Sequence, residues 1–376
     1  MARFRQQLLH AHEACAELGT SRSRFYALYS AYLRAGASRQ QQRWQPGLSG
    51  GDHAPLWPDE VLATLRKLLG ASPPLSYSGA ASELLRRHQF KTDRASVRRW
   101  ALAHGCAPDT RHQKSPRPVR RWQTQQIGQL WQYDASPHRW FADQPARFHL
   151  LEAIDDHSRL LPLARLYPAE TLLAHFDDLP AAFLARGRPL ALYVDDHSFF
   201  FTSQPDALTQ LGWALRFSEV SLRDAPTPQA KGKIERLHDY WQKRLPPLLA
   251  AEHIATLPAA NSLLASRVEH RNASETHREL CSTPLAAWRL ALRENRSALR
   301  PAPKCPWWPY VWSVRSNARI APEGTIAIGS LRHRLQRPPG STVVRCLHPN
   351  GDHSVLLHPP AHGAKPQLLL HLPAPR

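Results

Sequence analysis

Short apolar runs of strand length alternate with amphipathic runs of helix length between residues 129 and 250. The run LALYV at 190–194 is apolar without a break, which is typical of a strand covered by helices on both faces of a sheet. Residues 169–187 instead repeat apolar side chains at helical spacing. The predicted strands are residues 129–135, 147–154, 159–166, 190–194 and 213–217, and the predicted helices are residues 169–187, 205–212 and 229–250. This order predicts a mixed α/β core with an antiparallel start and a parallel continuation.

Two helical groups are expected before this core. Residues 11–35 indicate a helix-turn-helix, with Gly19 at the turn and Thr20 or Ser21 capping the second helix. Residues 58–69 and 78–104 indicate a second helix-turn-helix group. The arginines placed to contact DNA are Arg22 and Arg24 in the first group and Arg94, Arg98 and Arg99 in the second. An ordinary helical hairpin is the alternative for the first group, and we expect DNA binding by at least one of the two.

The pattern changes again in the C-terminal third. Between residues 306 and 360, short β runs are separated by Gly, Pro and Asn, which predicts a small β-barrel. The tail that follows is rich in proline and is expected to be disordered. The expected organisation is a helix-turn-helix at 1–37, a linker at 38–57, a second helix-turn-helix at 58–106, a basic linker at 107–123, the α/β core at 124–255, a helical connector at 256–300, the small β-barrel at 301–360 and the tail at 361–376.

The formal net charge of +19 is unevenly distributed. Residues 1–122 carry 20 Lys and Arg against 8 Asp and Glu, residues 123–254 carry 13 against 16, and residues 255–376 carry 16 against 6. Basic flanks suit phosphate backbones. A slightly acidic centre suits bound cations, because carboxylates placed near DNA need a metal to offset repulsion. An arginine-rich composition without function is the alternative explanation of the charge.

The five cysteines are odd in number and far apart, and no C-x-x-C pair occurs. A zinc ribbon or a disulfide framework is therefore not expected. Free thiols fit a reducing cytoplasm. No apolar run is long enough to suggest a membrane span, and the N-terminal residues do not resemble a secretory signal.

Three acidic side chains are placed where the predicted α/β order can bring them together. Asp134 ends the first predicted strand in an apolar setting, and a carboxylate in such a setting costs free energy unless it has a partner. Asp195 directly follows LALYV, and ligands gather at the carboxyl ends of strands of this type. Glu235 lies on the predicted helix at 229–250. Three such acids suit two magnesium ions about 3.5–4 Å apart, which activate a hydroxyl group and stabilise the leaving oxygen.

Four segments around these acids occur in a characteristic order: LWQYDASPHRW, AIDDHSRLLPLARL, LYVDDHSFFF and TPQAKGKIERLHDYWQKRL. Together they resemble the integrase-type core of DDE insertion-sequence transposases. That family has a ribonuclease H-like fold, which it shares with retroviral integrases. The resemblance covers about residues 120–255 closely and the flanks loosely. Any one of the segments alone would be a weak signal, whereas the ordered set is specific.

The resemblance implies that Asp134, Asp195 and Glu235 are catalytic and bind Mg²⁺ or Mn²⁺, with two ions in each active site. The cations close to Glu235, which are Lys231, Lys233 and Arg236, are expected to contact the DNA backbone. The helix-turn-helix groups resemble readers of transposon ends, and the C-terminal β region resembles the small barrel that follows some such cores. Expected partners are double-stranded DNA, at element ends and at the target, and further copies of the chain, with no membrane. The expected location is the bacterial cytoplasm, in association with the nucleoid.

Several alternatives stay open at this point. Asp196 adjoins Asp195 and is the alternative second ligand, whereas Asp155 and Asp156 are expected in a structural turn between strands. Three functions compete: an active transposase, a catalytically inactive transposase-derived DNA-binding protein, and a ribonuclease H-like nuclease that cuts without joining. The intact acids favour activity, and basic flanks on both sides favour a recombinase.

Overall fold

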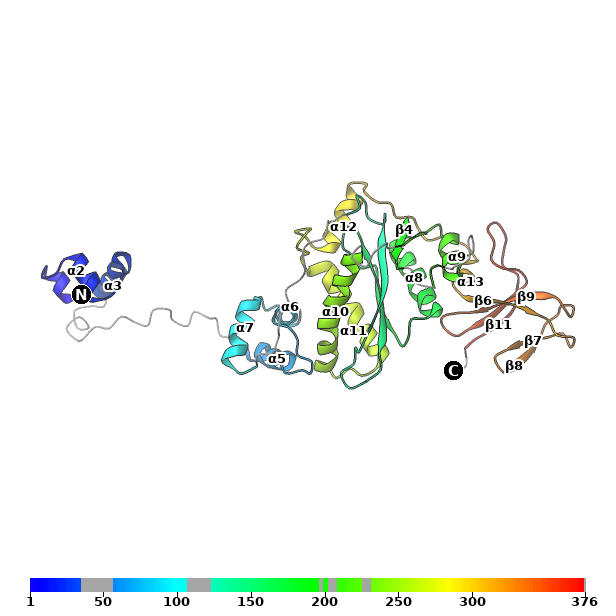
Figure 1. Cartoon of the computed structure of the whole chain (residues 1–376), viewed down its shortest axis with the longest axis horizontal. Helices are drawn as coiled ribbons and strands as arrows, with labels where there is room; N and C mark the ends of the chain where they lie inside the picture. The colour runs from blue at the N-terminus through cyan, green and yellow to red at the C-terminus, as the bar shows by residue number, and fades with distance from the viewer. Residues whose placement is uncertain (35–56, 107–122, 196–198, 202–207, 225–230, 375–376) are drawn as a thin grey trace. The chain divides into compact units, whose positions relative to one another are not determined.

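The computed structural model describes residues 1–34, 57–106, 123–195, 199–201, 208–224 and 231–374. The chain divides into two compact units, Met1–Asp59 and Glu60–Arg376, and each unit is described here by itself. Most of the expected linkers at 38–57 and 107–123 lies outside the described residues. Figure 1 shows the elements in their chain order, coloured from the N-terminus to the C-terminus.

The described part of the first unit is helical, with α1 (Ala2–Arg5), α2 (Ala11–Glu17) and α3 (Arg22–Arg34). Gly19 lies between α2 and α3 with a φ of +58°, a left-handed conformation that costs glycine little. Ser21 begins α3 by accepting a hydrogen bond from the backbone N–H of Arg24 at 3.3 Å. The expected pair of helices around Gly19 is therefore confirmed, and its binding of DNA stays a prediction.

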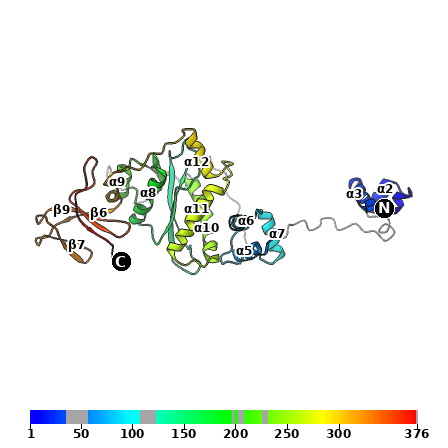
Figure 2. The same cartoon turned by 180° about the vertical axis from the view of Figure 1, so that it is seen from behind.

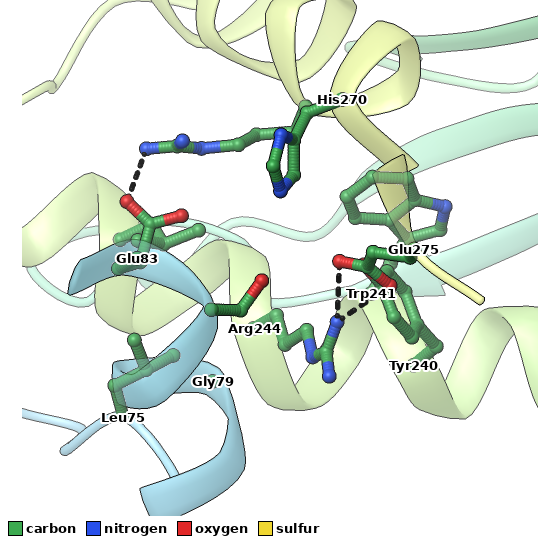
Figure 3. A pocket seen from close by; sticks show the side chains of 11 residues that line it. Leu75, Gly79, Glu83, Tyr240, Trp241, Arg244, His270 and Glu275 are labelled. Carbon is green, nitrogen blue, oxygen red and sulfur yellow. Dashed lines mark hydrogen bonds and ion pairs between the residues drawn. The ribbon is translucent and has the colours of Figure 1, made fainter. Parts of the chain in front are cut away.

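The second helical group consists of α5 (Asp59–Leu69), α6 (Tyr77–His88) and α7 (Arg94–Ala103). The side chain of Asp93 caps α7 by accepting from the backbone N–H of Ser96 at 2.7 Å. Helix α6 packs against the core through Glu83, which is buried and lies 2.8 Å from the guanidinium of Arg267. Figure 3 shows the small pocket at this contact, where Glu83 faces a second pair of opposite charges, Arg244 and Glu275, 3.1 Å apart.

The core is a five-stranded sheet in the order β3-β2-β1-β4-β5. Its strands are β1 (Trp131–His138), β2 (Phe148–Asp155), β3 (Leu163–Tyr167), β4 (Ala191–Val194) and β5 (Ser221–Asp224). The pairs β1–β2 and β2–β3 are antiparallel, whereas β1–β4 and β4–β5 are parallel. This confirms the predicted mixed α/β core, and it is the arrangement expected of a ribonuclease H-like core.

Helices cover both faces of this sheet. They are α8 (Leu172–Arg186), α9 (Gln210–Phe217), α10 (Gly232–Ala251), α11 (Leu257–Ser274) and α12 (Pro284–Arg293). Figures 1 and 2 show α10 and α11 on one side of the sheet and α8 on the other. Two separate apolar clusters fill the two interfaces, one including Phe176 and Phe183 of α8 and the other Ile234 and Trp241 of α10. Both faces are thus buried, as the unbroken apolar run at β4 predicts.

One predicted strand is a helix. Residues 213–217 belong to α9, which begins after Thr209, whose hydroxyl accepts from the backbone N–H of Gly212 at 2.9 Å. Leu211, Ala214 and Leu215 are all fully buried, and their spacing is that of a helix. The short apolar run WALRF was predicted as a strand because its composition is the same as that of a buried strand. The fifth strand is instead the short and mostly polar β5, at the edge of the sheet. The prediction of a helix at 205–212 falls partly outside the described residues.

The C-terminal region is β-rich, but its described strands do not form one closed barrel. A four-stranded antiparallel sheet has the order β11-β10-β9-β6, and a separate hairpin pairs β7 with β8. These strands are β6 (Val314–Arg319), β7 (Thr325–Ile328), β8 (Leu331–Arg334), β9 (Thr342–Leu347), β10 (His353–Leu356) and β11 (Leu368–Leu372), preceded by the short helix α13 (Trp308–Val311). The hairpin packs on the sheet through Ile326, beside Val343 and Val355. The expected barrel is therefore replaced by an open sheet with a packed hairpin.

The expected disordered tail at 361–376 is also wrong in part. Leu368–Leu372 forms β11, which pairs with β10 in the antiparallel sheet. The prolines around this strand led to the prediction of disorder, but the run LLLHL supplies apolar residues for the edge of the sheet. Across the described part of the chain, no helix combines the length and the apolar character that a membrane crossing requires.

Candidate active site

Two of the three predicted acids meet where β1 and β4 lie side by side. The parallel register pairs Trp131 with Leu192 and Gln132 with Tyr193, and continuing it places Asp134 level with Asp195. Strand β1 extends to His138, so Asp134 lies in the middle of this strand and not at its end, as the sequence had suggested. Asp195 directly follows β4, as predicted. The sheet therefore brings together two carboxylates that are 61 positions apart in the chain.

A lysine lies between these two carboxylates. The Nζ atom of Lys231 is 3.0 Å from Oδ1 of Asp134 and 4.0 Å from Oδ2 of Asp195. The Lys231 side chain is only 5% exposed, whereas that of Asp195 is 56% exposed. Lysine side chains are rarely buried to this degree without a partner of opposite charge. The described structure thus has one cation held by two of the predicted metal ligands.

Helix α10, which carries Glu235 in its first turn, is fixed along the same face of β1. The side-chain oxygen of Gln132 accepts from the backbone N–H of Ile234 at 3.2 Å, and the amide of Gln242 donates to the hydroxyl of Ser136 at 3.0 Å. These two contacts lie on either side of Asp134 along the strand. Lys231 is the N-cap residue of α10, and Glu235 follows it by four residues in the first turn of the helix.

Burial raises the pKa of the Asp134 carboxyl above its ordinary value. The neighbouring Lys231 ammonium opposes this shift, and the negative charge of Asp195 adds to it. Desolvation and like charge are two of the standard causes of a raised carboxyl pKa. Asp134 is therefore in surroundings where a cation is needed for the charged form to be stable.

A buried glutamate that the sequence analysis missed lies behind Asp134. Glu152 of β2 is fully buried, and neither of its carboxyl oxygens has a hydrogen-bond partner among the described residues. His238 of α10 lies beside it, with Nε2 at 3.4 Å from Oε1. Burial lowers the pKa of His238 to about 4, with Lys231 as a second cause, so this contact is not an ion pair at neutral pH. The sequence feature that could have identified Glu152 is its position as the single acidic residue inside the apolar run FHLLEAI.

The paired acids Asp155 and Asp156 hold a turn together, as expected for a structural role. Asp155 accepts from the backbone N–H groups of Gly128 at 2.7 Å and Ser158 at 2.8 Å. Asp156 accepts from the backbone N–H of Thr124 at 2.8 Å and is contacted by the ammonium of Lys233. Each carboxylate is thus occupied within the fold.

The predicted DNA contacts differ in their exposure. Arg22 and Arg24 are exposed on α3, and Arg94, Arg98 and Arg99 are exposed on α7. The Arg236 side chain is 64% exposed, with Nη1 3.6 Å from Oε1 of Glu279. Lys231 and Lys233 instead lie against aspartates, with 5% and 15% of their side chains exposed. These two lysines therefore cannot reach a phosphate in the conformation seen here.

The donor atoms at this site fit a hard divalent cation. Asp134 and Asp195 supply carboxylate oxygens, which Mg²⁺ prefers, and a positive group already lies between them. Within the described ranges, no three acidic, histidine or cysteine side chains are close enough to hold a metal as they stand. Glu235 is exposed and is not part of such a group. Asp196, the alternative ligand, lies outside the described residues.

The sequence is similar to those of two bacterial proteins. It is 32% identical over 198 residues to y4bF of Sinorhizobium fredii, which is named as a transposase, covering 51% of this chain and 43% of that protein. It is 36% identical over 152 residues to the transposase for insertion sequence IS1202 of Streptococcus pneumoniae, covering 39% of this chain and 32% of that protein. The chain thus spans less than half the length of these relatives. No protein-family model matches it.

Two solved structures have a weak likeness to the chain. One is the HTLV-2 integrase catalytic core domain in complex with magnesium, with a TM-score of 0.35 and 14% identity, covering 43% of this chain and 95% of that one. The other is the simian T-cell lymphotropic virus intasome in complex with a PP2A regulatory subunit, with a TM-score of 0.39 and 15% identity, covering 83% and 99%. The sequence matches show that 51% of the chain is similar to y4bF and 39% of it to the IS1202 transposase.

Proposed function

We propose that this chain is a DNA transposase that cuts DNA strands at the ends of a mobile element and joins them to a target. Asp134, Asp195 and Glu235 form its catalytic triad and hold Mg²⁺ or Mn²⁺. The observation that supports this most is the convergence of Asp134 and Asp195 around one positive group, Lys231. The relation to insertion-sequence transposases supports it independently.

Each acid would contribute from a different element. Asp134 lies on β1, the central strand of the sheet, where it pairs with Glu152 of β2. Asp195 follows the adjacent parallel strand, and Glu235 lies on the helix that crosses them. Two bound ions would supply the charge that activates the attacking hydroxyl and stabilises the leaving oxygen. The role of the protein is to fix the carboxylates at the spacing that such a pair requires.

Glu235 must join the two aspartates for the triad to work. It lies in the first turn of α10, four residues after Lys231, whose side chain already reaches both aspartates. A change of side-chain conformation at Glu235, together with movement of Lys231, would bring the third carboxylate to the site. Both changes involve residues at the first turn of α10 only.

The proposed substrate is double-stranded DNA at the element ends and at the target. The arginines of α3 and α7 are exposed and would contact its phosphates or base edges. Arg236 is exposed beside the catalytic acid and would contact the backbone near the reacting bond. Because an element has two ends, we propose that at least two copies of the chain act together on DNA.

Two other functions make different experimental predictions. An inactive transposase-derived protein would bind element ends without cutting them. A nuclease would cut the ends without joining them. A strand-transfer assay with linear element ends and Mg²⁺ separates the three, because only a transposase gives both cut ends and joined products. Cut ends without joined products, or bound but uncut ends, would replace the proposed function by one of the alternatives.

A further inference from the structure

Lys231 is held in an unusual position for a lysine. It comes directly before α10, and its side chain is buried against the sheet. Its ammonium contacts two carboxylates from neighbouring strands, at 3.0 Å for Asp134 and 4.0 Å for Asp195. Lys233, two residues later, is held separately by Asp156. The two lysines therefore have different carboxylate partners, and of the two it is Lys231 that faces the pair of candidate metal ligands.

A divalent cation shared by the two aspartates would need the same space. Mg²⁺ binds carboxylate oxygens at about 2.0–2.1 Å, and a bridging ion therefore lies between them. An ammonium at 3.0 Å from one of these carboxylates and 4.0 Å from the other already lies in that gap. A second cation there would meet the positive charge of the first at close range. A metal that bridges these two carboxylates would thus compete with the ammonium of Lys231 for the same oxygens.

We propose that Lys231 is a resident counter-ion, which neutralises the two aspartates before a metal binds and is displaced when it does. This inference rests on the proposed function, because it takes Asp134 and Asp195 as the metal ligands. Displacement would free a flexible positive side chain at the edge of the active site. The freed ammonium would then be available to a phosphate oxygen of DNA, so that loading with metal prepares the site for its substrate.

The inference predicts a change in the chemical reactivity of one lysine. Reductive methylation followed by mass spectrometry measures how far each amino group is accessible. In the full-length protein without DNA or metal, Lys231 should be protected, and the 68% exposed Lys243 should react readily. Saturating Mn²⁺ should raise the labelling of Lys231 severalfold, with the same half-saturation as Mn²⁺ binding measured by calorimetry. Lys233 is the matched control and should stay protected in both states, because Asp156 holds it.

Two variants complete the experiment. Asp134→Asn combined with Asp195→Asn should expose Lys231 to labelling without any metal. Lys231→Met should bind Mn²⁺ more tightly than the wild type, by about tenfold if the lysine fills the site nine-tenths of the time. Lys233→Met removes a nearby charge that does not face the aspartates, and it should leave this affinity unchanged.

The outcomes separate this inference from the proposed function. If Mn²⁺ binds at the aspartates while Lys231 stays protected, the displacement is overturned and the transposase proposal is unaffected. Equal Mn²⁺ affinities of the wild type and Lys231→Met would overturn it in the same way. If the wild-type protein binds no Mn²⁺ at all, the inference and the proposed metal-dependent chemistry fail together.

Discussion

Asp134 of β1 and Glu152 of β2 lie directly opposite each other in the antiparallel pair, with both carboxyl groups on the face covered by α10. Glu152 is fully buried, and burial raises its pKa well above the ordinary value, with the charge of Asp134 adding to the shift. Arg271 opposes the shift but does not cancel it. Ionisation of Glu152 is therefore opposed both by its burial and by the neighbouring charge of Asp134.

We expect Glu152→Gln to make the protein more stable than the wild type as the pH rises. A carboxyl with a raised folded-state pKa contributes its full stability below its unfolded value of about 4.5 and loses it as the pH rises through the folded pKa. Glutamine has the same shape and cannot ionise. The difference in unfolding free energy should grow by about 1.4 kcal/mol for each unit of pKa shift that the pH passes. Urea unfolding between pH 4.5 and 9 measures it.

The exposed Glu235→Gln provides the control for this prediction. Its unfolding free energy should follow the wild-type pH dependence, because Glu235 is not buried. Parallel curves for Glu152→Gln and the wild type over the whole range would show that Glu152 is not held protonated.

A second prediction concerns Glu83, the buried anion between α6 and the core (Figure 3). Three arginines converge on it, with contacts of 3.3 Å from Arg86, 2.9 Å from Arg87 and 2.8 Å from Arg267. Glu83→Gln would leave the buried Arg267 without its anion. Removing one partner of a buried pair costs about 3–5 kcal/mol, so thermal unfolding should begin at a clearly lower temperature.

Glu294→Gln is the matched surface control. Glu294 pairs with Arg296, but both side chains are more than a third exposed. Exposed pairs contribute about 0–1 kcal/mol. If Glu83→Gln is no less stable than Glu294→Gln, the packing of α6 against α11 does not depend on this ion pair.

Much of the core could be predicted because its patterns are local. The apolar run at β4 and the Gly19 turn each act within a few residues, and each is found where expected. The prediction placed Asp195 correctly after β4, but it placed Asp134 at the end of a strand, whereas Asp134 lies in the middle of β1. The two aspartates still meet, because the parallel register of β1 and β4 sets them level.

What the sequence did not show depends on contacts between distant segments. Glu152 and His238 meet only after β2 and α10 pack together. A lysine is expected at the surface from its residue type, yet Lys231 is buried and contacts two aspartates. The prediction of a strand at 213–217 is wrong, because an apolar run that is fully buried in a helix has the same composition as a buried strand. In each case the tertiary packing decides the outcome.

A third prediction concerns DNA binding by α7. Arg98 and Arg99 are exposed on this helix, within the basic N-terminal part of the chain. Replacing both by alanine should weaken binding of the full-length protein to element-end DNA. The slope of log K against log salt should fall by about 1 for each phosphate that the variant no longer neutralises. Fluorescence anisotropy over a range of salt concentrations measures both quantities.

Arg289→Ala provides the control, because Arg289 is equally exposed but belongs to α12 and to neither predicted helix-turn-helix. It should bind end DNA with the wild-type affinity and salt slope. An unchanged slope after the double substitution at Arg98 and Arg99 would mean that α7 does not contact the DNA backbone. If the wild type bound random duplex and element-end DNA with equal affinity at physiological salt, specific recognition of element ends would be contradicted.

The triad itself is tested by removing one charge at a time. Asp134→Asn, Asp195→Asn and Glu235→Gln keep the size of each side chain and remove its negative charge. Strand transfer on linear element ends in Mg²⁺ should fall in each variant to the level seen without the metal, while binding of the same DNA persists. Retained joining in any one of these variants, at near wild-type rate, would contradict the assignment of that residue as a metal ligand.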